Sequence, residues 1–171
     1  MKQRAFTLME MMVVVVIIGI LAVGSVFAFN KYTAAAKRNG TIAHHNTLKK
    51  WIQLQITKCS INPNAKIIYR ENFSDRKSHF NCPMDAGAAL PYFRSHFIYE
   101  GWKSLYSGRS PICQGCYFEG GKAVDWKIKF NVGAIQLDSI GSGDFGTFRI
   151  ITYYLDQDNN YQNLTDLITV F

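Results

Sequence analysis

Glu10 is the residue whose type and position most strongly suggest chemistry. It is the only charged residue between Arg4 and Lys31, and apolar side chains follow it almost without interruption to Phe29. That stretch is long enough to cross a hydrocarbon core of roughly 30 Å. A carboxylate at the edge of such a segment costs on the order of 2–3 kcal/mol even on lenient insertion scales, so Glu10 indicates a function and a missing cationic partner.

Two simpler interpretations of this N-terminus leave Glu10 and Phe6 unexplained. A conventional secretory signal has an apolar core of roughly 7–15 residues. The core here is longer, spanning residues 11–29, although residues 26–28 would form a passable cleavage site. A plain membrane anchor is not favoured by the positive-inside rule, because more basic residues follow the span than precede it (Lys31, Lys37 and Arg38 against Lys2 and Arg4).

Residues 4–19 resemble the start of a type IV prepilin, a family that includes the pseudopilins of type II secretion. The resemblance rests on Ala-Phe-Thr-Leu-Met-Glu over residues 5–10 and on the apolar run behind it. It implies that a prepilin peptidase removes the leader, residues 1–5, by cutting between Ala5 and Phe6, and then methylates the amine of Phe6. Ala5 departs from the glycine usual in the family, and Phe27 stands where many members have proline.

Cleavage would give Glu10 a partner, because Phe6 then carries a free, methylated amine. The Glu10 carboxylate of a neighbouring subunit is the natural counter-ion of that cation. Pairing the two in an apolar filament core favours assembly and sets the axial register. Removing one partner of a buried pair typically costs several kcal/mol, because it strands the other charge.

The apolar segment is predicted to continue into one long helix over residues 6–58. Its first half, residues 6–30, is apolar all round and suits lipid or neighbouring helices. Its second half, residues 31–58, is amphipathic and is expected to lie against the head, residues 59–171. Apolar side chains recur there near helical spacing at Ile42, Leu48, Trp51, Ile52 and Ile56.

Gly19 and Gly24 stand inside the apolar half, where glycine costs about 1 kcal/mol against alanine. One interpretation is close helix–helix packing, since small residues let backbones approach. The other, which the resemblance implies, is local unwinding between the two glycines when the filament assembles.

The head is predicted to be β-rich. Residues 122–132 alternate apolar and polar side chains, and further strands are expected over residues 134–140 and 147–155. Residues 161–171 are expected to form a last strand or a docked tail. The predicted fold is therefore α+β, with an antiparallel sheet packed on the long helix. The resemblance implies the same roll.

Four cysteines lie beyond the apolar helix, and export would place them where disulfides form. Three connectivities are available. The favoured one joins Cys59 to Cys82 and Cys113 to Cys116, while an arrangement that joins Cys59 to Cys116 is nearly as good. A redox pair or a zinc site built on Cys113 and Cys116 is a minor alternative.

No catalytic residue, resident metal or other cofactor is predicted. Asp156, Asp158 and Asn160 have the spacing of calcium ligands, but the loop lacks the glycine and the final acid of such a site, so a solvated turn is favoured. The four histidines form no defensible ligand or catalytic set.

The net charge of +7 raises the question of nucleic acid. The basic residues concentrate in the leader and in residues 31–58, so most of this charge is explained by the stem beside lipid headgroups. A stripe of Lys122, Lys127 and Lys129 is the alternative that would bind nucleic acid.

The sequence thus predicts a non-enzymatic pilin that starts as an inner-membrane precursor and polymerises with copies of itself into a surface filament for adhesion, motility or DNA uptake. Its expected partners are the prepilin peptidase and the pilus assembly machinery. A type II secretion pseudopilin is the first alternative. A membrane-anchored periplasmic binding or thiol-redox domain is the second.

Overall fold

The computed structural model describes residues 7–71, 77–119, 122–141 and 146–170, without the side chains of residues 118, 119 and 122. The chain divides into two compact units, residues 1–36 and residues 37–171. Helix α1, Leu8–Ile61, runs through the boundary between them. It ends three residues beyond the predicted position, and the amide of Asn62 still donates to the carbonyl of Lys58.

In the first unit, α1 is an apolar helix whose large apolar side chains are all exposed, from Leu8 at 86% to Val14 at 45%. This segment is long and apolar enough to cross a membrane. Its length and composition therefore fit the membrane anchor of a precursor.

The second unit is built on a four-stranded sheet with the order β3-β6-β7-β8. Its strands are β3, Ile112–Cys113; β6, Ile135–Ile140; β7, Thr147–Leu155; and β8, Tyr161–Thr169. The pairs β6–β7 and β7–β8 are antiparallel, whereas β3 runs parallel to β6, so the sheet is mixed rather than wholly antiparallel. The predicted α+β class is confirmed.

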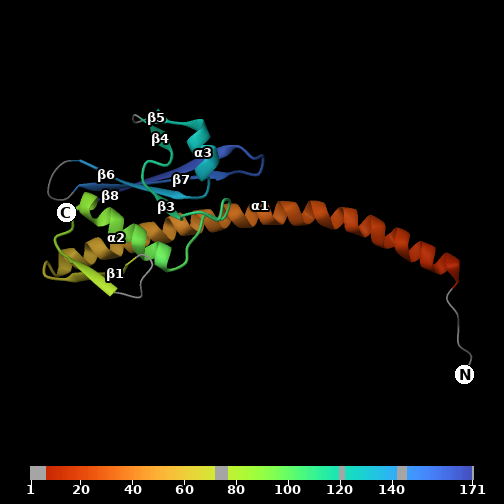
Figure 1. Ribbon diagram of the computed structural model, residues 1–171, viewed down its shortest axis with the longest axis horizontal. Coiled ribbons are helices and arrows are strands. Elements are labelled where there is room, and N and C mark those ends of the chain that lie inside the picture. Colours follow the sequence, from red (N-terminus) through yellow and green to blue (C-terminus); the bar gives the residue numbers. More distant parts are fainter. Residues whose placement is uncertain (1–6, 72–76, 120–121, 142–145, 171) are drawn as a thin grey trace, which may run out of the picture. The chain divides into compact units, whose positions relative to one another are not determined.

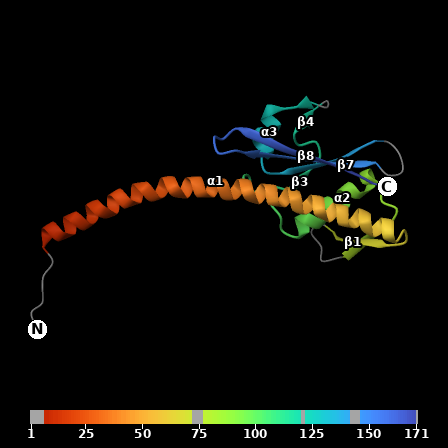
Figure 2. The same ribbon diagram turned by 180° about the vertical axis from the view of Figure 1, so that it is seen from behind.

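The head part of α1 and helix α2, Ala86–Tyr99, cover one face of this sheet (Figures 1 and 2). Leu48 and Ile52 are completely buried there, together with Phe93 of α2 and Phe148 and Ile150 of β7. Asp85 caps α2 by accepting a hydrogen bond from the amide of Ala88. The hairpin of β1, Lys66–Arg70, and β2, Lys77–Asn81, continues from the end of α1.

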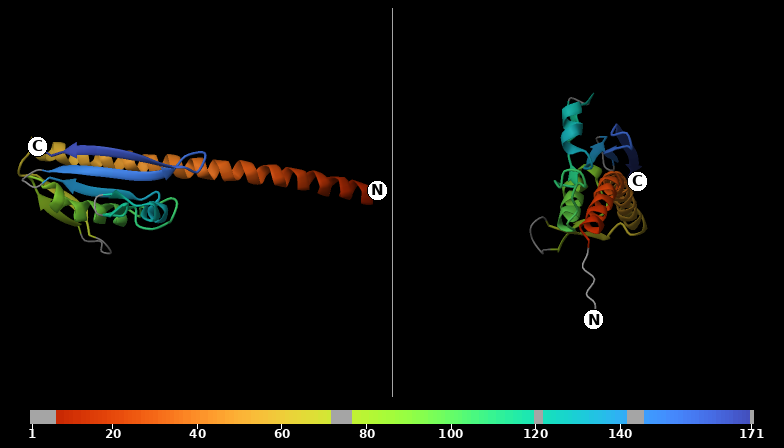
Figure 3. Two further views of the ribbon diagram at one scale, coloured as in Figure 1. Left: turned by 90° about the horizontal axis from the view of Figure 1, so that it is seen from above. Right: turned by 90° about the vertical axis from the view of Figure 1, so that its right-hand side faces the viewer.

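The other face of the sheet carries a smaller layer, which is made of the short hairpin β4, Phe118–Glu119, with β5, Lys122–Ala123, and of helix α3, Asp125–Asn131. The right-hand view of Figure 3 shows α3 on the side away from α2 and the head part of α1. The core of this smaller layer is a separate cluster of four buried residues: Tyr117, Ile128, Ile151 and Tyr153.

Helix α3 corrects the sequence prediction, because the strand expected over residues 122–132 is wrong. Only residues 122 and 123 are extended there, and α3 follows. Asp125 in the first turn and Lys129 in the last turn complement the helix dipole. Gly133, with φ of +79°, then supplies the left-handed residue that commonly ends a helix. The alternating pattern failed because, of the apolar side chains of α3, only Ile128 is buried against the sheet, and the segment does not form a half-buried strand.

Candidate functional site at the N-terminus

The described part of the N-terminal motif is a capping box that holds Glu10 at the start of α1. The carboxylate of Glu10 accepts a hydrogen bond from the backbone amide of Thr7 at 2.8 Å and from the Thr7 hydroxyl at 2.9 Å. In return, the amide of Glu10 donates to the Thr7 hydroxyl oxygen at 3.3 Å. This reciprocal arrangement satisfies amides that a helix start otherwise leaves without partners.

The capping box fixes where the negative charge lies. Glu10 is exposed within its own chain, so its remaining acceptor positions are open to a group from outside. A carboxylate at this end is also favoured by the helix dipole. Ala5 and Phe6, the predicted cleavage and methylation residues, lie outside the described residues.

The two glycines of the apolar segment lie in unbroken helix. A methyl group added at Gly19 or at Gly24 would meet no atom within 4 Å apart from the neighbouring backbone of α1 itself. Nothing in the described chain therefore requires a small residue at either position. Contacts with other helices and unwinding on assembly both remain hypotheses for them.

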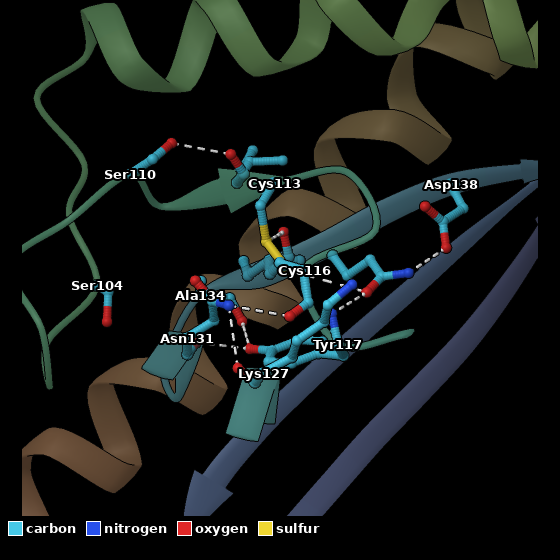
Figure 4. The surroundings of a disulfide bond; sticks show 12 residues. Ser104, Ser110, Cys113, Cys116, Tyr117, Lys127, Asn131, Ala134 and Asp138 are labelled. Carbon is cyan, nitrogen blue, oxygen red and sulfur yellow. Dashed lines mark hydrogen bonds between the residues drawn. A yellow bond between two sulfur atoms is a disulfide. The ribbon is translucent and has the colours of Figure 1, made fainter. Parts of the chain in front are cut away.

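The head contains two disulfides, and they differ in the length of chain they close. Cys59–Cys82 joins the last turn of α1 to the residue after β2, with 23 residues of sequence separation. Cys113–Cys116 closes a tight loop after β3, with a separation of 3 (Figure 4). Since loop-closure entropy grows with loop length, Cys59–Cys82 should stabilise the head more than Cys113–Cys116 does.

Hydrogen bonds hold the Cys113–Cys116 loop against the sheet and α3 (Figure 4). The amide of Tyr117 donates to the buried side chain of Gln136 at 2.8 Å, and the Asn131 amide group donates to the Cys116 carbonyl at 2.9 Å. The Tyr117 hydroxyl donates to the Ala134 carbonyl. Burial raises the pKa of Tyr117, so its hydroxyl keeps its proton and remains a donor. These contacts make the loop a structural element.

No group of three or more His, Cys, Asp and Glu side chains that could hold a metal ion occurs within the described residues. The cysteines of the zinc alternative are joined in disulfides.

At the calcium-like turn, the Asp156 carboxylate accepts hydrogen bonds from the amides of Asp158 and Asn160, each at 2.9 Å. It also accepts one from Gln162 at 3.0 Å. These donors lower the pKa of Asp156. The site is a hydrogen-bonded turn between β7 and β8.

A buried polar cluster was missed by the sequence analysis. His45 of α1 is completely buried, with Nδ1 2.8 Å from the Thr152 hydroxyl of β7 and Nε2 2.9 Å from the Asp166 carboxylate of β8. Lys49, one turn further along α1, donates to Asp166 at 2.6 Å. The signal in the sequence was a histidine at helical spacing on the apolar face of the helix. Such a histidine is more often a hydrogen-bonded core residue than part of a functional site.

The order Asp166–His45–Thr152 resembles a hydrolytic triad, but it cannot act as one. Thr152 is completely buried, so no substrate can reach its hydroxyl. Burial lowers the pKa of His45, and the neighbouring Asp166 only partly opposes this. Burial raises the pKa of the Asp166 carboxyl, but hydrogen bonds from Lys49 and His45 outweigh it and leave that pKa below its ordinary value. The cluster fastens α1 to the two strands.

Comparison with known families identifies the N-terminal segment. Residues 1–26 match the prokaryotic N-terminal methylation motif, which is the class III signal peptide of type IV pilins. The match contains Glu10, the capping residue Thr7 and the predicted cleavage position. Neither the curated proteins nor the solved structures contain a match to this chain.

The motif supports a prepilin-like protein. The chain carries the N-terminal motif of prepilins, a group of structural proteins that includes pilins and pseudopilins. It implies processing by a prepilin peptidase and handling by the pilus assembly machinery. Together with the apolar first unit, it fits a membrane-anchored precursor.

Proposed function

We propose that this protein is a structural subunit of a type IV pilus. It is trimmed between Ala5 and Phe6, methylated at Phe6, and polymerised with copies of itself through the first part of α1. Adhesion, motility or DNA uptake would then be tasks of the assembled filament rather than of a catalytic site.

The observation that supports this proposal best is an apolar helix that finds no partner within its own unit. All of its large apolar side chains from Leu8 to Phe29 remain exposed, and one carboxylate, Glu10, is held at its start. Lipid can cover such a surface before assembly, and the equivalent helices of other copies can cover it afterwards. The second charge that Glu10 requires would be the amine of Phe6 on a neighbouring copy.

Shear fractionation of the source cells tests this proposal. We expect the chain in the sheared surface material of normal cells, and only in the membrane fraction of cells that lack the prepilin peptidase. A chain that is processed by the peptidase but absent from sheared material would favour the pseudopilin alternative. A chain that keeps residues 1–5 in normal cells would favour the anchored domain.

A further inference from the structure

The charged residues of the head are unevenly distributed along the chain. Residues 59–171 contain eleven basic and eleven acidic residues. Residues 101–137 hold five of the basic ones and only two of the acidic ones, whereas residues 138–171 hold one basic and five acidic residues. The apparently neutral head therefore has a basic segment, which comprises the loop after α2, the β4–β5 hairpin and α3.

Two large aromatic side chains of this basic segment are exposed on α3. Trp126 is 62% exposed and Phe130 is 51% exposed. They are four residues apart, so they lie on one face of the helix. Ile128, on the opposite face, is buried against the sheet and fixes the helix in this orientation. Exposed apolar side chains that adjoin one another indicate an interaction site more strongly than singly scattered ones do.

Cations accompany both rings. The guanidinium carbon of Arg109, from the loop before β3, lies 3.8 Å from the centroid of the Phe130 ring. The amine of Lys127 lies 5.5 Å from the centroid of the Trp126 ring. Lys129 adds an exposed cation on the same helix. These five residues, Arg109, Trp126, Lys127, Lys129 and Phe130, form what we term the α3 patch.

We infer that the α3 patch is a binding site for single-stranded nucleic acid. Sites for this ligand combine cations that follow the phosphates with aromatic rings on which unpaired bases stack. A duplex buries its base faces in its own stack, so it could use the cations but not the rings. A ligand that used the cations alone would give no reason for two exposed aromatic rings.

The order of the layers in the head would leave the α3 patch accessible in a filament. This accessibility is the one point that rests on the proposed function. Helix α3 and the head part of α1 lie on opposite sides of the four-stranded sheet (Figure 3). A filament that places α1 inside would therefore leave α3 on the outside.

Binding can be measured with the purified full chain in a nonionic detergent, by fluorescence anisotropy of a labelled oligothymidylate. We expect the affinity to fall with salt, with a slope of about −0.7 for each phosphate contacted. Trp126→Ala should weaken binding at least about fivefold, since one stacked base contributes that much or more. Trp126→Phe should restore most of the affinity, and Lys129→Gln should make the salt slope shallower by about 0.7.

Two substitutions on the β1–β2 hairpin are matched controls for charge and for exposed apolar surface. Lys77→Gln removes an exposed cation, and Ile68→Ala removes a side chain that is 59% exposed. Both should bind the oligonucleotide as the unaltered chain does. An unchanged circular dichroism spectrum would show that Trp126→Ala has kept its fold.

Three outcomes would overturn the assignment. The first is no binding at low salt, and the second is equal affinity for a duplex of the same length. The third is binding that Trp126→Ala leaves unchanged while Lys129→Gln weakens it, which would indicate a purely electrostatic contact. None of these outcomes bears on filament formation, which shear fractionation of the Trp126→Ala strain measures separately.

Discussion

Helix α1 contains two stretches with opposite surroundings. In residues 8–29 every large apolar side chain is exposed, whereas in residues 41–56 Leu48 and Ile52 are completely buried against the sheet. Both stretches are regular helix, so the difference does not come from backbone conformation. It comes from the surroundings: the second stretch packs against the sheet of its own unit, whereas the proposed function gives lipid or other copies as the partners of the first. The two stretches should therefore respond to substitution in different assays.

The largest effect is expected from Glu10→Val, which removes the one charge of the first stretch. In the proposed filament the amine of Phe6 then loses its counter-ion, and a stranded buried charge costs several kcal/mol. The amount of chain in sheared material should fall at least about tenfold, with the membrane fraction and the stability of the head unchanged.

Glu100→Val is the matched control for Glu10→Val, because it removes an exposed carboxylate just after α2. It should leave the yield of filaments unchanged. Normal filaments from Glu10→Val cells would show that the predicted pairing does not contribute to assembly.

In the second stretch, Leu48→Ala should destabilise the head by about 2–5 kcal/mol, because it opens a cavity in a well-packed core. Urea unfolding of the full chain in detergent measures this loss of stability. Trp51 is a suitable fluorescent reporter, because its ring lies edge-on to the Phe93 ring with the two centroids 4.9 Å apart. Leu54→Ala is the control on the same helix, since Leu54 is 62% exposed. Equal effects of the two substitutions would contradict the described packing of α1.

The next effect is a pH dependence that only the second stretch should show. The pKa of His45 is lowered in the folded chain, chiefly by burial, so the unfolded chain binds more protons just below pH 6.5. The contribution of His45 to the free energy of unfolding should therefore be fully present above pH 6.5. It should decrease as the pH falls below that value. One such group contributes at most about 1.4 kcal/mol per pH unit.

His45→Gln should reduce this slope without abolishing it, because burial also lowers the pKa values of His44 and His96. Below about pH 4 the loss should continue as Asp166, whose pKa is lowered in the fold, takes up its proton. Urea unfolding at a series of pH values measures both slopes. A head whose stability rose on acidification from pH 7 to pH 5 would refute the assignment.

The smallest effect is expected from Thr7→Ala, which removes the hydroxyl of the capping box but keeps Glu10. Loss of such a cap costs about 1 kcal/mol. Amide hydrogen exchange in detergent should accelerate about fivefold in the first turn of α1 and should not change in residues 41–56. Thr33→Ala, in the same unit, is the control, because the Thr33 hydroxyl donates only to carbonyls within the helix, at 2.9 and 3.0 Å. Equal acceleration in the two variants would contradict the cap.

The sequence predicted the elements whose patterns are local. The apolar helix, the strands predicted over residues 134–140 and 147–155, which are β6 and β7, and the turn at residues 156–160 follow from hydropathy period and turn residues. Helix α3 was mistaken for a strand because an apolar residue at every second position also fits a short helix that buries only one of them.

The polar cluster of His45 could not be predicted, because its members come from one helix and two strands. His45 lies 107 residues from Thr152 and 121 residues from Asp166 in the sequence. The register that joins them is set by packing, which no local pattern contains. For Glu10 the sequence indicates only the chemistry of a partner, a cation, and the proposed function assigns that cation to another copy.

The most direct test of the proposed function is the intact and N-terminal mass of the chain in sheared surface material. The account predicts a chain that begins at N-methylated Phe6 and is four hydrogens lighter than its reduced form, because both disulfides are closed. A chain that retains residues 1–5, or that is found only in membranes, would contradict it.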